Sequence, residues 1–127
     1  MKKIPLTYII DDDNIFVFIL KKSLEKNQSF LEVLNFNDGQ SFLERLQEKC
    51  FIVPDIILLD INMPVLDGWQ VLEQIEKLPN KDKLNIVVMS SSVDVSDIER
   101  AKTFSTVRNF ISKPFNKEKL NQLLEMI

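Results

Sequence analysis

Hydrophobic residues in this chain alternate between short unbroken runs and longer stretches in which they recur every three or four positions. An unbroken apolar run bounded by turn residues is typical of a strand that is covered on both faces of a parallel sheet. The strand candidates are five mainly apolar segments, residues 4–10, 30–36, 56–59, 84–89 and 107–111. The third is the clearest, because its four large apolar residues end abruptly in Asp60 and are followed by Met-Pro and Asp-Gly.

The stretch after each run has helical spacing. In residues 15–26, the spacing predicts that Phe16, Ile19, Leu20 and Leu24 face inward. The second helix is expected to begin at Asp38-Gly39 and to carry Phe42, Leu43 and Leu46, and the third to span residues 66–78. The fourth is expected to run through Ile98 and Phe104 after a cap at Asp94 or Ser96. The last helix is expected to carry Leu120, Leu123, Leu124 and Ile127. Residues 79–83 are expected to form a polar loop, and Phe42 and Trp69 to lie in the core.

Five strand-then-helix units predict one α/β domain with a doubly wound parallel sheet, right-handed crossovers and helices on both faces. The sequence shows no repeat, low-complexity tract or linker, so we expect residues 1–127 to form this single domain. The chain ends with the fifth helix, and we therefore expect no output domain.

Composition excludes several classes of function. A formal net charge of −3 gives no support for direct nucleic-acid binding, and no apolar run approaches the roughly 20 residues that cross a membrane. The single cysteine, Cys50, cannot form an internal disulfide, which favours a cytoplasmic protein with an inert thiol. The absence of histidine excludes Ser-His-Asp triads, Cys-His pairs and histidine-ligated zinc. Any chemistry must therefore use carboxylates, hydroxyls, lysine and a hard cation.

Polar residues follow the strands at the edge where open α/β sheets bind their ligands. They are Asp11, Asp12 and Asp13 after the first strand, Asp60 after the third, Ser90 after the fourth and Lys113 after the fifth. Carboxylates that lie this close repel one another unless a cation compensates. An all-oxygen ligand set favours magnesium over zinc. A carboxylate with a metal, a hydroxyl and an ammonium group around it can act as a nucleophile toward phosphorus, and Asp60 is the candidate.

Simpler readings of single residues remain open. Asp11, Asp12 and Asp13 could cap the first helix and complement its dipole, and Asp13 is expected to do only this. Ser90 could make local backbone hydrogen bonds in a turn.

Four fragments taken in order resemble the receiver domain of response regulators in bacterial two-component signalling. They are Ile10-Asp11-Asp12-Asp13, Leu58-Leu59-Asp60-Ile61-Asn62-Met63-Pro64 with Asp67-Gly68, Met89-Ser90-Ser91, and Phe110-Ile111-Ser112-Lys113-Pro114-Phe115. The resemblance covers essentially the whole chain. It implies a flavodoxin-like (βα)5 fold with strand order 2-1-3-4-5.

The resemblance also implies roles for individual residues. Asp60 would accept a phosphoryl group, and magnesium would be held by Asp12 and Asp60, by the backbone carbonyl of Asn62 and, through water, by Asp11. Ser90 would bind the phosphoryl group, Lys113 would pair with Asp60 or its phosphate, and Phe110 would rotate as the switch. The Lys113-Pro114 bond would be cis. Serine at position 90 stands where threonine is commoner, and Asn62 and Ser92 occupy positions that tune dephosphorylation.

The function implied by the resemblance is that of a stand-alone, magnesium-dependent response regulator. It would receive its phosphoryl group from a sensor histidine kinase or a phosphotransfer protein, and signal by binding a downstream protein. It would be a phospho-accepting switch, not a turnover enzyme. A phosphate shuttle or sink in a phosphorelay is an alternative with the same fold. A small phosphatase of the haloacid-dehalogenase type, with Asp11 as nucleophile, is a rival that leaves Asp60 without a role.

The first helix carries more apolar residues than one face can bury. Residues 15–20 are all apolar, so if Phe16, Ile19 and Leu20 point inward, then Ile15, Val17 and Phe18 partly face solvent beside the acidic residues. Exposed apolar patches often mark partner surfaces. We therefore expect Ile15, Val17 and Phe18 to dock the phosphodonor, with burial against a neighbouring segment as the alternative.

Overall fold

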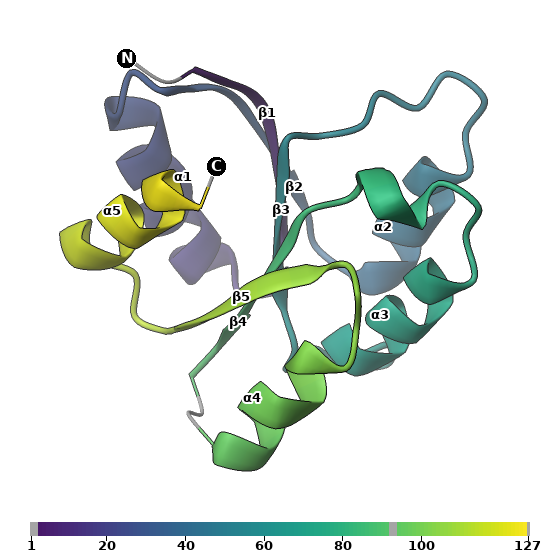
Figure 1. The fold of residues 1–127 in the computed structure, drawn as a ribbon. Coiled ribbons are helices and arrows are strands. Elements are labelled where there is room, and N and C mark those ends of the chain that lie inside the picture. Colours follow the sequence, from purple (N-terminus) through teal and green to yellow (C-terminus); the bar gives the residue numbers. More distant parts are fainter. Residues whose placement is uncertain (1–2, 92–93, 127) are drawn as a thin grey trace.

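The computed structural model describes residues 3–91 and 94–126, and these form five strands that alternate with helices (Figure 1). The strands are β1 (Ile4–Ile10), β2 (Phe30–Phe36), β3 (Ile56–Asp60), β4 (Ile86–Ser90) and β5 (Val107–Ser112). The α-helices are α1 (Asn14–Lys26), α2 (Gly39–Leu46), α3 (Gly68–Glu76), α4 (Val95–Lys102) and α5 (Lys117–Glu125), and a short 3₁₀ helix, η1, spans Lys81–Lys83.

The strands form one parallel sheet in the order β2-β1-β3-β4-β5. Helices α1 and α5 lie on one side of the sheet, and α2 and α3 lie on the other (Figure 1). The predicted flavodoxin-like fold, its strand order and its two helical layers are confirmed.

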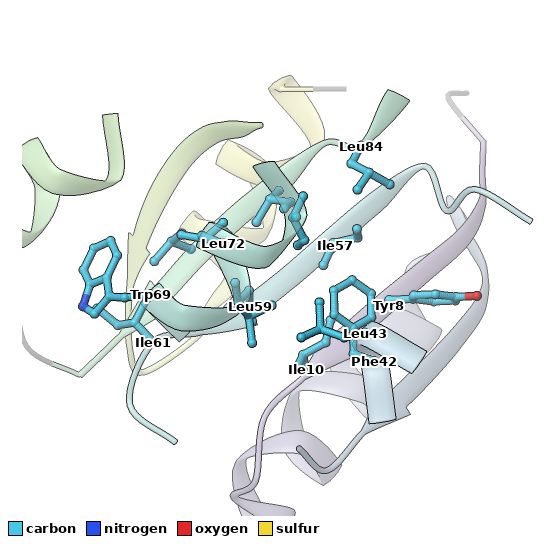
Figure 2. Packing of buried hydrophobic residues seen from close by; sticks show 14 of the residues in the cluster. Tyr8, Ile10, Phe42, Leu43, Ile57, Leu59, Ile61, Trp69, Leu72 and Leu84 are labelled. Atoms are coloured by element: carbon cyan, nitrogen blue, oxygen red, sulfur yellow. The ribbon is translucent and has the colours of Figure 1, made fainter. Parts of the chain in front are cut away.

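The side chains of the sheet alternate between two apolar cores. In β3, Ile57 and Leu59 pack with the residues of α2 and α3, including Phe42 and Trp69, as Figure 2 shows for one of the two cores. Ile56 and Leu58 pack on the other side with residues of α1 and α5. Both layers bury β3, which explains its unbroken apolar sequence, and the predicted core positions of Phe42 and Trp69 are confirmed.

The predicted orientation of α1 is partly wrong. Val17, Leu20 and Leu24 form the buried stripe, and Val17 is only 6% exposed. Ile19, which was expected to face inward, is 58% exposed, while Ile15 and Phe18 face solvent as predicted. Because every position from 15 to 20 is apolar, the sequence is compatible with several rotations of the helix about its axis. Packing against the sheet selects the stripe at positions 17, 20 and 24.

Several predicted boundaries also need correction. Helix α3 ends at Glu76 instead of residue 78, and it begins at Gly68 instead of residue 66 because Asp67 caps it in a capping box with Gln70. Strand β4 begins at Ile86 instead of Leu84, and α4 ends at Lys102, before Phe104. The predicted polar loop contains η1, which is tied to α3 by an ion pair of 2.7 Å between Lys81 and Glu76.

The residues that cap the N-termini of α2 and α4 are among those predicted from the sequence. Asp94, not Ser96, caps α4, and Asp38 caps α2. Ile127, expected in the last helix, lies outside the described residues.

Within residues 3–91 and 94–126, no helix has both the length and the apolar character that crossing a bilayer requires.

Candidate functional site

The register of the sheet places the predicted site residues on one edge. Ile10 pairs with Leu59 across β1 and β3, so Asp11 and Asp60 end neighbouring strands at the same level. Asp60 pairs with Met89, and Ser90 pairs with Ser112, which puts Ser90 one residue and Lys113 two residues beyond the level of Asp60. The parallel arrangement therefore gathers residues that are up to 102 positions apart in the chain.

Three carboxylates and one ammonium group meet at this edge. Oxygen atoms of Asp11, Asp12 and Asp60 lie within 4.8 Å of one another. The Nζ atom of Lys113 lies 2.8 Å from Oδ2 of Asp11 and 3.6 Å from Oδ1 of Asp60. Asp11 and Asp60 are buried, whereas Asp12 is exposed. One cation against three anions leaves an excess of negative charge that a divalent ion would compensate.

Burial raises the pKa of the Asp60 carboxyl from its ordinary value of 3.8 to about 6. The charge of Asp11 adds to this rise. The backbone N–H of Asn62, which donates to Oδ1 of Asp60 at 3.1 Å, and the charge of Lys113 act in the opposite direction and keep the pKa from rising further. The Asp60 carboxylate is therefore destabilised in the absence of a cation.

We expect the Asp60→Asn protein to be more stable than the wild type at neutral pH in EDTA, and nearly equal to it at low pH. The unfolded chain releases this proton near pH 3.8, whereas the folded protein holds it to about pH 6. The folded state binds more protons in this window, so wild-type stability falls as the pH rises through it. A neutral amide avoids this loss, and after allowance for solvent screening we expect a gain of about 1–2 kcal/mol.

Urea unfolding at about pH 4 and about pH 7.5 tests this expectation. A gain of equal size at both values would contradict it, because a difference that does not depend on pH cannot come from ionisation of Asp60.

A side-chain contact links the ends of β3 and β4. The Nδ2 atom of Asn62 donates to Oγ of Ser90 at 3.1 Å, and Ser90 is fully buried. The resemblance assigned a backbone role to Asn62 and did not reveal this side-chain contact. Serine lacks the methyl group that stiffens threonine at χ1, and the hydrogen bond from Asn62 restrains the Ser90 side chain in its place.

The ammonium group of Lys113 also lies over the ring of Phe16, 4.2 Å from its centroid. A cation over an aromatic face is attracted by the quadrupole of the ring. Phe16 was predicted only as an inward-facing residue of α1, and the sequence carried no signal that it would meet Lys113 from the far end of the chain. The Lys113-Pro114 bond is cis, as the resemblance implied.

The remaining predicted residues fall into separate places. Asp13 caps α1 by accepting hydrogen bonds from the backbone N–H groups of Ile15 and Phe16 at 3.1 Å, as expected. Phe110 is half-buried and lines a cavity of about 90 Å³ between α4 and β5. Ser92 lies outside the described residues. Cys50 is exposed, and its inertness stays a prediction.

Comparison with known proteins agrees with this arrangement. A family model for the response regulator receiver domain matches residues 7–125. The chemotaxis protein CheY of Listeria monocytogenes is 30% identical over 120 residues, which cover 94% of this chain and 96% of that protein. A solved two-component response regulator from Cytophaga hutchinsonii is 29% identical with a TM-score of 0.89, covering 98% of this chain and 96% of that one. The phosphorylated cyanobacterial phytochrome response regulator RcpA is 28% identical with a TM-score of 0.78, covering 98% of this chain and 90% of that one.

Proposed function

This chain belongs to the family of response regulator receiver domains, and we propose that it accepts a phosphoryl group on Asp60 and changes its protein partners in response. Receiver domains are phospho-accepting switches rather than turnover enzymes. The observation that carries the proposal is the convergence of Asp60 with Asp11, Asp12 and Lys113 at the strand ends. Relatives such as CheY, which this chain covers over 96% of its length, support a stand-alone role.

In the proposed reaction, a carboxylate oxygen of Asp60 forms a bond to the phosphorus of a phosphohistidine on a sensor kinase or a phosphotransfer protein. The P–N bond of the donor breaks, and its electron pair stays on the imidazole nitrogen. Lys113 pairs with the phosphoryl oxygens, and the Ser90 hydroxyl donates a hydrogen bond to one of them. This chain has no histidine of its own, so the phosphoryl group must come from another protein or from a small donor.

The acidic cluster fits a magnesium ion. Receiver domains bind Mg²⁺ at a cluster of aspartates, and the three carboxylates that meet here form such a group. We propose that Asp12 and Asp60 hold the ion through their carboxylates, Asn62 through its backbone carbonyl and Asp11 through water. When bound, magnesium would neutralise charge on the phosphoryl oxygens.

Labelling with acetyl phosphate tests both the acceptor role and the metal. We expect about one phosphoryl group per chain in the presence of magnesium, and a rate at least about 100-fold lower in EDTA, since a metal ion contributes several kcal/mol to such a step. Steady turnover of a phosphate monoester beyond one equivalent would contradict the proposal and favour a hydrolase.

The phosphatase alternative with Asp11 as nucleophile is not supported. Oδ2 of Asp11 accepts a hydrogen bond from Lys113 at 2.8 Å, and Oδ1 accepts one from the backbone of Asp13 at 2.9 Å. Both of its oxygens are therefore engaged, and the family match places the chain among receiver domains.

We propose that the signal leaves through α4 and β5. Phosphorylation would draw Ser90 toward the phosphoryl group and allow Phe110 to turn inward from its half-buried position. The cavity of about 90 Å³ that Phe110 lines together with Ile98 and Ala101 supports this proposal, because it shows that α4 and β5 are not tightly packed there. The two packings of this surface would then bind different partners.

The donor is proposed to dock on the exposed side chains of α1. With Val17 buried, the apolar surface consists of Ile15, Phe18 and Ile19. These residues lie on the helix that starts beside the acidic cluster, and the ammonium group of Lys22 lies 5.5 Å from the Phe18 ring centroid. This surface replaces the predicted one, in which Val17 took the place of Ile19.

Replacing Phe18 with Asp should slow phosphotransfer from the cognate kinase by at least about tenfold, because the substitution puts a charge into an apolar contact. Labelling by acetyl phosphate should not change. Ile52→Asp is the matched control, since Ile52 is also an exposed apolar residue but lies in the loop before β3, outside the proposed docking surface. Normal transfer to a folded Phe18→Asp protein would argue against this surface.

A further inference from the structure

The peptide unit that joins Ser112 to Lys113 is held at both ends. The backbone N–H of Lys113 donates to the carbonyl of Ser90 at 2.7 Å. The carbonyl of Ser112 accepts from Nζ of Lys119 at 2.6 Å, and the same Nζ donates to the carbonyl of Pro114 at 2.8 Å. One ammonium group therefore bridges the carbonyls of the two residues on either side of Lys113.

Lys119 occupies a position where a cation is unfavourable for the helix itself. It is the third residue of α5, and the positive end of the helix dipole disfavours a cation in the first turn. Its backbone N–H is held by the side chain of the capping residue Asn116 at 2.9 Å, and its side chain is half-buried. Lys117, two residues earlier, is exposed and makes no hydrogen bond or ion pair with the described residues. The two lysines lie in the same helical turn, but only Lys119 contacts the backbone on either side of Lys113.

We infer that Lys119 is a positioning residue for phosphoryl transfer. It fixes the backbone from which Lys113 extends, and thereby places Nζ of Lys113 at 2.8 Å from Asp11 and 3.6 Å from Asp60. This inference rests on the proposed function of Asp60 as the acceptor. Lys119 itself touches only backbone carbonyls, so its effect passes through Lys113.

The restraint matters because the side chain of Lys113 is flexible. A lysine ammonium group sits on a four-carbon stem and can take many positions unless both ends of the stem are held. Asp11 and the Phe16 ring hold the tip, while Ser90 and Lys119 hold the base. A misplacement on the order of 1 Å at a reacting centre costs up to about 100-fold in rate. Since three of the four restraints survive the loss of Lys119, we expect about a tenfold loss.

A double-mutant cycle with Lys113 tests the inference. Lys119→Met keeps the length of the side chain and removes its charge, and it should slow labelling by acetyl phosphate about tenfold in the presence of magnesium. In the Lys113→Met background the same change should alter the residual rate by less than about twofold, because the group that Lys119 positions is gone. Lys119→Arg, which keeps a cation able to donate to both carbonyls, should restore most of the rate. Lys117→Met is the control for charge and should label normally.

The outcomes separate this inference from the proposed function. Equal fractional losses in the two backgrounds would show a general structural role and overturn the inference, as would normal labelling of Lys119→Met. If urea unfolding shows that the Lys119→Met protein is poorly folded, Lys119→Gln, which keeps an amide donor without the charge, replaces it in the double-mutant cycle. The same comparison of fractional rate losses in the two backgrounds then applies. Failure of the wild type to label at all, or labelling that survives the loss of Asp60, would instead overturn the proposed function.

Discussion

Replacing Asp60 with Asn is expected to abolish labelling by acetyl phosphate. The amide cannot serve as the nucleophile, and no neighbouring carboxylate can take over. Both oxygens of Asp11 accept hydrogen bonds, and Asp12 is exposed at the rim of the cluster. Removal of a nucleophile typically costs several orders of magnitude, so we expect a loss of at least about 1,000-fold.

The measurement is the rate of phosphoryl incorporation with excess donor and magnesium. Asp67→Asn is a suitable control, because Asp67 caps α3 through its side chain and asparagine caps equally well. The Asp67→Asn protein should label at the wild-type rate. If Asp60→Asn were labelled as fast as the wild type, Asp60 would not be the acceptor.

Replacing Gly68 with Ala is expected to have the largest effect on stability. A Cβ atom at position 68 would lie 2.5 Å from Cα of Ile61 and 2.7 Å from the backbone oxygen of Asp60. Main-chain atoms at the end of a buried strand cannot move aside as a side-chain tip can. Relief requires α3 to move away from β3, and overpacking of this kind costs about 2–3 kcal/mol.

The shift would also move the backbone of Asp60, so labelling by acetyl phosphate should slow together with the loss of stability. Gly39→Ala provides a matched comparison. Gly39 and Gly68 each begin a helix directly after a capping Asp, so the gain in helix propensity is the same for both. At position 39 the nearest atom is Cγ2 of the Val71 side chain, at 2.5 Å, and the backbone oxygen of Leu66 lies 3.4 Å away, so no main-chain atom stands in the way.

We therefore expect Gly39→Ala to cost less than half as much as Gly68→Ala in urea unfolding, with little change in labelling. Equal losses for the two variants would show that the contact of Gly68 with the strand backbone is not the cause. The sequence marked Asp67-Gly68 as turn residues and carried no information on this close approach.

The order of elements and the chemistry of the site could both be predicted from the sequence. The unbroken apolar run before Asp60 indicates a strand covered on both faces, and such strands belong to a parallel sheet. In a parallel sheet all strand ends share one edge, so residues that follow different strands must meet there. This rule predicts that Asp11, Asp60, Ser90 and Lys113 lie together, and the ion pairs of Lys113 with both aspartates agree with it.

The rotation of α1 could not be predicted. Apolar residues fill every position from 15 to 20, so no periodicity distinguishes one face, and the choice of Val17 over Ile19 for the core depends on how the helix packs against the sheet. The same limit applies to the start of α3, where the capping box of Asp67 and Gln70 begins the helix at Gly68, two residues later than the predicted start at residue 66.

Only the tertiary structure revealed the groups that hold the reactive ones in place. The amide of Asn62 on Ser90, the ring of Phe16 against Lys113 and the bridge from Lys119 to the backbone around Lys113 all depend on side-chain directions and on distances of a few ångströms. By itself the sequence determined which strand ends meet, because period and polarity specify strands and their edges. It left open which neighbouring side chains touch there, because the same hydrophobic pattern is compatible with many packings and only close packing of the whole chain selects one.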